Sequence, residues 1–253
     1  PDFRVTTRDG RRLITEQQSE NIDGLIIDLR SNGGGSLEEA INLTGLFIPT
    51  GPVVQVRSSR GNVEVLQDQD PEVLYGGPMT VVVNRLSASA SEIFAGAIQD
   101  YGRGLVIGGQ TFGKGTVQSL RPLTEGQLKI TQAKFYRVSG ESTQHQGVIP
   151  DIMFPSLFDK EKIGESALSL ALPWDTIQPA RELKNNPITS KLPQLRELHS
   201  ARIEHNPDFI FMSEQKDLFT EMREKTEMSL NEKIRRYERA INDERRLALE
   251  NKR

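Results

Sequence analysis

Three serines in RLSASASEIF (residues 85–94) are candidates for nucleophilic chemistry. They stand at positions 87, 89 and 91, after the apolar run MTVVVN and before a helix-like stretch. A serine hydroxyl becomes an effective nucleophile only when a base takes its proton. These residue types therefore indicate acyl transfer through a serine intermediate, provided that the sequence also supplies a base.

Ser89 occupies the position that the local pattern assigns to a helix cap. Ser89 and Glu92 fit the capping box, in which a serine precedes the helix and a glutamate follows three residues later. A cap is the commoner role for such a serine. The two roles are compatible, because a hydroxyl at a strand-to-helix turn is exposed and the helix N-terminus stabilises negative charge. Free backbone N–H groups at this turn would also suit an oxyanion.

The setting of one lysine predicts the base. Two of the three histidines, His199 and His205, fall in a charged helical region, and His145 in STQHQG stays an alternative. Lys114 in GGQTFGKGT follows an apolar run and stands between two glycines, whereas most lysines lie among other charges. Because burial lowers the pKa of a lysine, Lys114 is the candidate for a neutral base.

A phosphate-binding loop is the competing interpretation of the same stretch. Gly108, Gly113 and Lys114 nearly match the spacing of a P-loop. Gly115 stands where that loop needs a serine or threonine for magnesium, and the TVQSL that follows is strand-like. A strand offers no helix N-terminus to hold phosphate, so a nucleotide site is disfavoured.

Two strand–turn–helix units must position these residues. The first runs through GLIIDLR, the glycine turn SNGGGS (31–36) and a helical pattern over 37–48. The second runs through TVVVN (80–84), the serine turn and a helical pattern over 91–102. A continuous apolar run such as 24–30 is typical of a strand buried on both faces of a parallel sheet.

Further elements complete an α/β core. They are a helix over 7–19 that contains Gly10, a hairpin over 53–66 that turns at RGN, a strand at 104–109 and further strands within 116–138.

The composition changes after Pro150. Prolines interrupt the segment 155–193, and the chain beyond it is charged, with helices expected over 190–206 and 213–251. Apolar residues recur every three to four positions in the second of these helices, which indicates an amphipathic arm. The predicted organisation is a core over 1–154, a junction over 155–189 and a helical extension over 190–253.

The composition of the 253 residues excludes several function classes. Without cysteine there is no thiol catalysis, disulfide or cysteine-bound metal, and no metal or cofactor is expected. The net charge of −3 gives no reason to expect nucleic acid or an anionic membrane as a partner. No apolar stretch is long enough to span a bilayer. A start at Pro1 without a leader predicts an excised or processed fragment.

Three stretches together resemble the carboxyl-terminal processing proteases, also called tail-specific proteases. They are DGLIIDLRSNGGG, the long SASASEIFAGAIQDYGRGLVIGGQTFGKGTVQ and STQHQGVIPDI. The charged helical region is similar to the extension of the Gram-negative, periplasmic Prc-type branch. The long stretch is highly specific, whereas NGGG alone would be a weak signal.

The resemblance implies a serine–lysine dyad on a crotonase/ClpP-like fold. Ser89 would be the nucleophile and Lys114 the general base, with Gln118 orienting the lysine amine. Asp100 matches an aspartate that is sometimes counted with the active residues, and its place here predicts a support near a helix end. Backbone N–H groups of Ala90 and Gly35 would form the oxyanion hole.

The resemblance also implies substrates and a location. It predicts an endopeptidase acting in the periplasm on proteins with apolar, unstructured C-termini. The family's PDZ-type domain and N-terminal helical region are not seen in this sequence. A scaffold is the alternative function, in which an inactive or regulated core leaves the helical arm to bind an adaptor or a second copy. A crotonase-fold acyl-CoA enzyme ranks lower, since it gives Ser89 and Lys114 no role.

Overall fold

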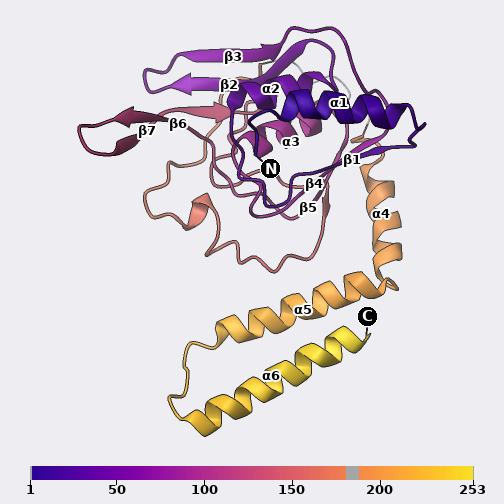
Figure 1. Ribbon diagram of the computed structural model, residues 1–253, viewed down its shortest axis with the longest axis vertical. Coiled ribbons are helices and arrows are strands. Elements are labelled where there is room, and N and C mark those ends of the chain that lie inside the picture. Colours follow the sequence, from indigo (N-terminus) through magenta and orange to yellow (C-terminus); the bar gives the residue numbers. More distant parts are fainter. Residues whose placement is uncertain (1, 181–187, 253) are drawn as a thin grey trace. The chain divides into compact units, whose positions relative to one another are not determined.

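The computed structural model describes residues 2–180 and 188–252 (Figure 1). The chain divides into two compact units, Pro1–Phe154 with Asp159–Lys191, and Pro155–Phe158 with Leu192–Arg253. Part of the predicted junction, residues 181–187, lies outside the described residues. The first unit is mixed α/β and the second is helical, in agreement with the predicted fold class.

A parallel sheet forms the first layer of the first unit. Its strands lie in the order β1-β4-β5-β8, with bounds Leu25–Asp28, Met79–Val83, Leu105–Gly108 and Ile152–Met153. All three neighbouring pairs are parallel. The predicted strands at 24–30, 80–84 and 104–109 are therefore confirmed, and their carboxyl ends meet at one edge of the sheet.

The prediction that the first strand is buried on both faces is wrong. Burial alternates along β1, and the side chain of Ile26 is 72% exposed. The face of β1 that carries Ile26 is therefore exposed, whereas β1 pairs with β4 along its edge. Burial also alternates along β4, where Met79, Val81 and Val83 are buried.

Three helices pack with these strands around one hydrophobic core. They are α1 (Thr6–Gln18), α2 (Leu37–Gly45) and α3 (Ala90–Asp100). Gly10, which interrupts the helical pattern of α1, lies against α2, where an added Cβ would be 3.2 Å from the Leu43 side chain. A small residue at this point lets the two helices approach closely. Phe47 and Phe94 meet edge to face in the core at 5.9 Å.

An antiparallel sheet carries the two long hairpins of Figure 1. Its order is β3-β2-β7-β6, with bounds Val63–Asp68, Gly51–Ser58, Gln127–Tyr136 and Thr116–Pro122. The hairpin predicted over 53–66 is thus confirmed as β2 and β3. The register of β6 against β7 shifts between Val117 and Gln118, which marks a β-bulge.

The segment 159–180 returns to the first unit beyond β8. It contains one short 3₁₀ helix, η1 (Glu165–Ala167). Near its end, the carboxylate of Asp175 accepts hydrogen bonds from the side chains of Arg57, Lys134 and Tyr136. Arg57 and Lys134 are register partners on β2 and β7, and the carboxylate offsets the repulsion between these like charges.

The second unit contains the helices α4 (Leu192–Ile203), α5 (Pro207–Glu224) and α6 (Glu232–Lys252). The prediction of a single helix over 213–251 is wrong, because α5 ends at Glu224 and α6 begins only at Glu232. The Asn231 side chain accepts the N–H groups of Lys233 and Ile234 and so starts a new helix. No helix among the described residues is long and apolar enough to cross a membrane.

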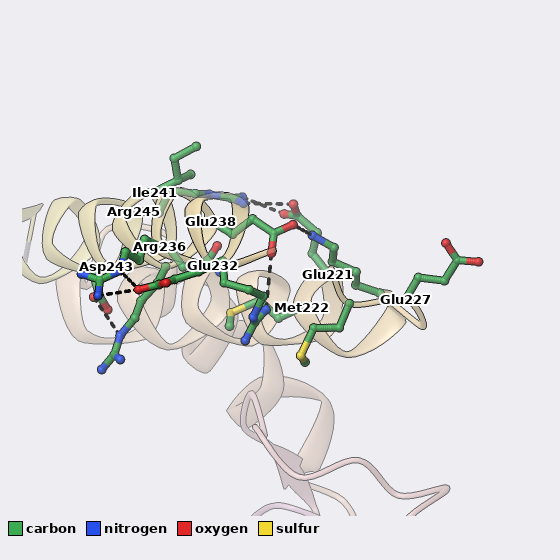
Figure 2. Close-up of a pocket in the computed structure, with 14 residues that line it drawn as sticks. Glu221, Met222, Glu227, Glu232, Arg236, Glu238, Ile241, Asp243 and Arg245 are labelled. Atoms are coloured by element: carbon green, nitrogen blue, oxygen red, sulfur yellow. Dashed lines mark hydrogen bonds and ion pairs between the residues drawn. The ribbon is translucent and has the colours of Figure 1, made fainter. Parts of the chain in front are cut away.

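Ion pairs join α5 to α6, as Figure 2 shows. Arg245 donates two hydrogen bonds to Glu221, and Lys225 pairs with Glu238. Beside these pairs lies a groove of about 730 Å³ that Met222 and Ile241 also line. Exposed ion pairs of this kind each contribute little stability. Their main effect is therefore on how α5 and α6 are aligned, and they add little to the free energy of packing between the two helices.

Candidate active site

Three loops converge at the carboxyl ends of β1, β4 and β5. The glycine turn follows β1, the serine turn follows β4, and the loop with Lys114 follows β5. Backbone bonds join neighbouring loops, from Ala88 N–H to Asn32 O at 3.0 Å and from Phe112 N–H to Ser87 O at 2.9 Å. Open α/β folds place their ligands at this edge of a parallel sheet.

The three candidate serines have different surroundings. Ser87 is fully buried and donates to Leu29 O at 2.8 Å, and Ser91 is fully buried and donates to Asn32 O at 2.9 Å. Both hydroxyls hold the serine turn against the loop that follows β1. Ser89 is only partly buried and immediately precedes α3. Of the three, Ser89 is therefore the serine that a substrate can reach.

The backbone of Ser89 is strained. Its φ is 58° and its ψ is −116°, a region that residues with a side chain seldom adopt. Such strain persists only where surrounding contacts enforce it, and it gathers at functional sites. A serine on a sharp, strained strand-to-helix turn is the backbone arrangement of a nucleophile elbow.

One buried carboxylate, that of Glu92, joins the serine turn to the lysine loop. Its Oε2 accepts the N–H of Ser89 at 2.8 Å and the N–H of Lys114 at 2.9 Å. Its Oε1 accepts the Thr111 hydroxyl at 2.6 Å and the Gly113 N–H at 2.7 Å. The glutamate of the capping box thus serves the helix N-terminus and a second loop at once.

This shared acceptor fixes how far apart the two loops can be. Since the Ser89 and Lys114 nitrogens both donate to the same oxygen atom, they lie within about 6 Å of each other. Residues 25 positions apart in the sequence are thereby neighbours in the fold. Proximity of nucleophile and base is the first requirement for their cooperation.

Burial raises the pKa of Glu92 to about 7. The side chain is fully buried, and burial penalises its charged form. The four hydrogen bonds from Thr111, Gly113, Ser89 and Lys114 favour the charged form and oppose this rise. Burial is the larger of the two influences, so Glu92 changes its charge near neutral pH.

Burial lowers the pKa of Lys114 below its ordinary value. The positive charge of Lys129 lowers it further, whereas the carboxylates of Glu165 and Glu92 act in the opposite direction. A lysine must lose its proton before it can act as a base, and burial favours the neutral amine. The net direction agrees with the prediction of a neutral lysine, although two carboxylates oppose it.

The glycine turn lies directly against the serine turn. A Cβ added to Gly34, whose φ is 92°, would lie 2.5 Å from Ala88 O and 2.7 Å from Ala90 N. The Gly34 N–H is occupied by the Asn32 side chain at 2.9 Å. Within the described residues, neither the Gly35 N–H nor the Ala90 N–H has an acceptor. Two free donors thus stand at the edge where these turns meet.

The structure places Gln118 outside this cluster. Its side chain is exposed and donates to the Thr131 hydroxyl at 3.3 Å. The bulge before Gln118 interrupts the alternation of β6, so that Thr116 is buried and Gln118 is not. In this arrangement the Gln118 amide forms a hydrogen bond between β6 and β7 and, within the described part of the chain, none with Lys114.

Asp100 lies at the far end of α3. It stands eleven residues after Ser89, which corresponds to about 16 Å along a helix. Its buried carboxylate pairs with Arg137 and accepts the Ser139 N–H at 3.2 Å. These contacts tie the end of α3 to the chain beyond β7 and are those of a structural support.

His145 contributes its backbone to the lysine loop. Its N–H donates to Gly113 O at 2.9 Å, and its φ of 66° is left-handed. Its ring Nε2 is buried and has no hydrogen-bond partner within the described residues. The contact with Gly113 makes His145 part of the support of this loop.

Several residues of the site were not predicted from the sequence. Arg85, Thr111 and Gln144 are buried and bind the backbone or the side chains around Lys114. Only Glu92 had a local signal, the capping box. The others act across long sequence separations, where no spacing pattern reveals them.

Comparisons with known proteins agree with this geometry. Residues 1–154 match peptidase family S41, and residues 158–253 match the C-terminal domain of tail specific protease. The tail-specific protease of Haemophilus influenzae is 45% identical over 98% of this chain and 37% of that protein. A carboxy-terminal-processing protease of Bartonella bacilliformis is 42% identical over 53% of this chain and 32% of that protein. The chain thus spans about a third of the length of these relatives.

A solved structure shares the fold over about two thirds of the chain. The photosystem II D1 C-terminal processing protease is 32% identical, with a TM-score of 0.57, over 66% of this chain and 44% of that chain. The mature CPAF structure, at 19% identity and a TM-score of 0.51, shares the fold alone. The sequence match, the fold and the converging loops lead to one assignment. The chain belongs to peptidase family S41, the serine-type peptidases that include the tail-specific proteases.

Proposed function

We propose that this protein is a serine endopeptidase with a dyad of Ser89 and Lys114. The neutral Lys114 amine takes the hydroxyl proton as the Ser89 oxygen attacks a peptide carbonyl. The C–N bond then breaks, the leaving amine receives the proton and an acyl-enzyme remains. Water, deprotonated in turn by Lys114, hydrolyses the ester and restores Ser89.

The observation that supports this proposal is the shared carboxylate of Glu92. It holds the N–H groups of Ser89 and Lys114 on one oxygen, so the loops of nucleophile and base are fixed together. Burial lowers the pKa of Lys114, as a base requires. The strained backbone of Ser89 is consistent with a nucleophile elbow.

The oxyanion of the tetrahedral intermediate would be bound by the backbone N–H groups of Gly35 and Ala90. Both lack an acceptor within the described residues and stand where the glycine and serine turns meet. Donors that are fixed before the reaction lower its barrier without further reorganisation. Gln118 would orient the lysine amine after leaving Thr131, and Asp100 would support the end of α3.

The substrates proposed are proteins with apolar, unstructured C-termini, and the location proposed is the bacterial periplasm. Both come from similarity to tail-specific and carboxy-terminal-processing proteases. The test is cleavage of an unstructured peptide with an apolar tail by the full-length protein. Ser89→Ala and Lys114→Ala should each lower kcat by at least about 1,000-fold. Wild-type turnover in either variant would refute the dyad.

A scaffold is the second candidate, because the helical unit leaves large apolar side chains exposed. Leu230 is 99% exposed and Tyr237 is 68% exposed. Such residues suit an adaptor or a second copy of the chain. Leu230→Ser with Tyr237→Ser should then abolish the association and spare peptide cleavage. Unchanged association, measured by analytical ultracentrifugation, would exclude this candidate.

A further inference from the structure

Arg85 is a buried cation whose hydrogen-bond partners are neutral. It is 3% exposed and forms no ion pair with a described carboxylate. Its guanidinium donates to Thr111 O, to Ile163 O at 2.6 Å, to Lys160 O at 3.2 Å and to the Ser166 hydroxyl at 3.2 Å. A buried charge costs free energy that neutral acceptors only partly offset, which calls for a role beyond packing.

These acceptors belong to two segments. Thr111 precedes Lys114 by three residues, whereas the other three acceptors lie in residues 159–167, hereafter the strap. The strap also contacts the lysine loop directly, since the Glu165 N–H donates to Phe112 O at 3.0 Å. A Cβ on Gly164 would lie 2.2 Å from the Arg85 guanidinium, so the strap and the arginine fit closely.

A second connection from the strap reaches the other side of Lys114. The fully buried Gln144 accepts the Gly115 N–H at 2.8 Å and donates its amide to the Glu165 carboxylate at 3.2 Å. Glu92 holds the N–H groups of Gly113 and Lys114 between these points. The backbone of the loop is thus fixed on both sides of the lysine, and the strap is joined to each.

We propose that Arg85 is a positioning residue and that the strap is part of the active site, holding Lys114 in register with Ser89. Arg85 stands four residues before Ser89 and binds the loop of Lys114, so it links the two turns directly. Glu92 links the serine turn to the lysine loop by accepting backbone N–H groups from both. Arg85, which belongs to the serine turn, links it to the same loop by donating to the carbonyl of Thr111. This inference rests on the proposed dyad.

The first test compares Arg85→Gln and Arg85→Lys in the full-length protein. Arg121→Gln, on the exposed part of β6, is the matched control. Arg85→Gln should lower kcat by about 100-fold with little change in KM, because a small displacement of a catalytic group costs about this much. Arg85→Lys should recover part of the loss. A folded Arg85→Gln with wild-type kcat, or with only a raised KM, would overturn the proposal.

A second pair of variants serves if Arg85→Gln does not fold. Glu165 is the first residue of η1, where proline is tolerated, so Glu165→Pro removes the N–H that donates to Phe112. Glu165→Ala removes the same side chain but keeps this N–H. The proposal predicts a lower kcat for Glu165→Pro than for Glu165→Ala. Equal kcat values in the two variants would contradict it.

Labelling by a fluorophosphonate separates this inference from the dyad itself. If the wild-type protein is not labelled at Ser89, the dyad fails. If the wild type is labelled and Arg85→Gln reacts at the same rate, the dyad stands and the role of Arg85 fails. Two results together support both the dyad and the positioning role of Arg85. Folded Arg85→Gln and Glu165→Pro are labelled more slowly than the wild type, and the acid limb of their pH profile is displaced from that of the wild type.

Discussion

The serine turn and the lysine loop reach the same carboxylate in different ways. The serine turn supplies the side chains that hold it, namely the glutamate of the capping box and the hydroxyls of Ser87 and Ser91, which donate to the loop after β1. The loop around Lys114 has no regular structure, and groups from distant segments hold it in place. Glu92, Gln144 and the strap provide these contacts.

The two halves of the proposed dyad therefore depend on different contacts. The serine turn has a strained backbone that its neighbours enforce, so its geometry depends on the packing of the sheet edge. The lysine loop depends on a few buried polar groups, and each one removed leaves unpaired backbone groups behind. Substitutions at these groups should therefore affect the base more than the nucleophile.

The largest effect on turnover, beyond the dyad itself, is expected for Glu92→Gln. Glutamine has one acceptor oxygen in place of two and brings an N–H₂ group toward backbone donors. We expect kcat to fall by about 100-fold, measured with a fluorogenic peptide. Wild-type kcat in this variant would show that the carboxylate is only a helix cap.

Glu92 also predicts a pH dependence of stability. Its pKa in the folded protein is about 7, above the ordinary value of 4.5, so the folded state holds the proton more tightly. This contribution to stability is fully present below pH 4.5 and is lost as the pH rises to about 7. Chemical unfolding across this range should show the loss in the wild type, and Glu92→Gln should lack it.

A smaller effect is expected for Gln118→Ala. If Gln118 leaves Thr131 and orients the lysine amine during catalysis, kcat falls by about tenfold. Thr131→Val is the control, because it removes only the partner seen in this structure. Unchanged kinetics in Gln118→Ala would leave this residue with a role in the β6–β7 hairpin alone.

Lys129→Gln should shift the pH profile slightly. The charge of Lys129 lowers the pKa of Lys114, so its removal raises this pKa. Because the base must be neutral, the acid limb of kcat/KM then moves to higher pH. Lys129→Arg keeps the charge and should leave the limb in place. A shift to lower pH in Lys129→Gln would contradict the assignment of this limb to Lys114.

Asp100→Asn should affect turnover least and stability most. Asp100 pairs with Arg137 in a buried site far along α3, and breaking such a pair costs about 3 kcal/mol. The free energy of unfolding should fall accordingly, while kcat at low temperature stays near that of the wild type. A variant that keeps the stability of the wild type but has no activity would show that Asp100 acts in catalysis and not only as a structural support.

The sequence predicted the elements with strong local patterns. The strand–turn–helix units, the hairpin and the serine turn follow from periodicity and from turn chemistry over a few residues. The exposure of Ile26 did not follow, because it depends on which elements cover each face of the sheet. The break before α6 was missed because Asn231 caps a new helix within a region of uniform periodicity. Arg85 and Gln144 act across the fold and leave no mark in local spacing.

In the proposed mechanism Ser89 is the nucleophile and Lys114, whose loop Glu92 holds beside it, is its base. Fluorophosphonate labelling of the full-length protein, mapped by mass spectrometry, tests this claim most directly. We expect a single adduct on Ser89 that is lost in Lys114→Ala and formed slowly in Glu92→Gln. An adduct on Ser87 or Ser91, or labelling of Ser89 that does not depend on Lys114, would contradict it.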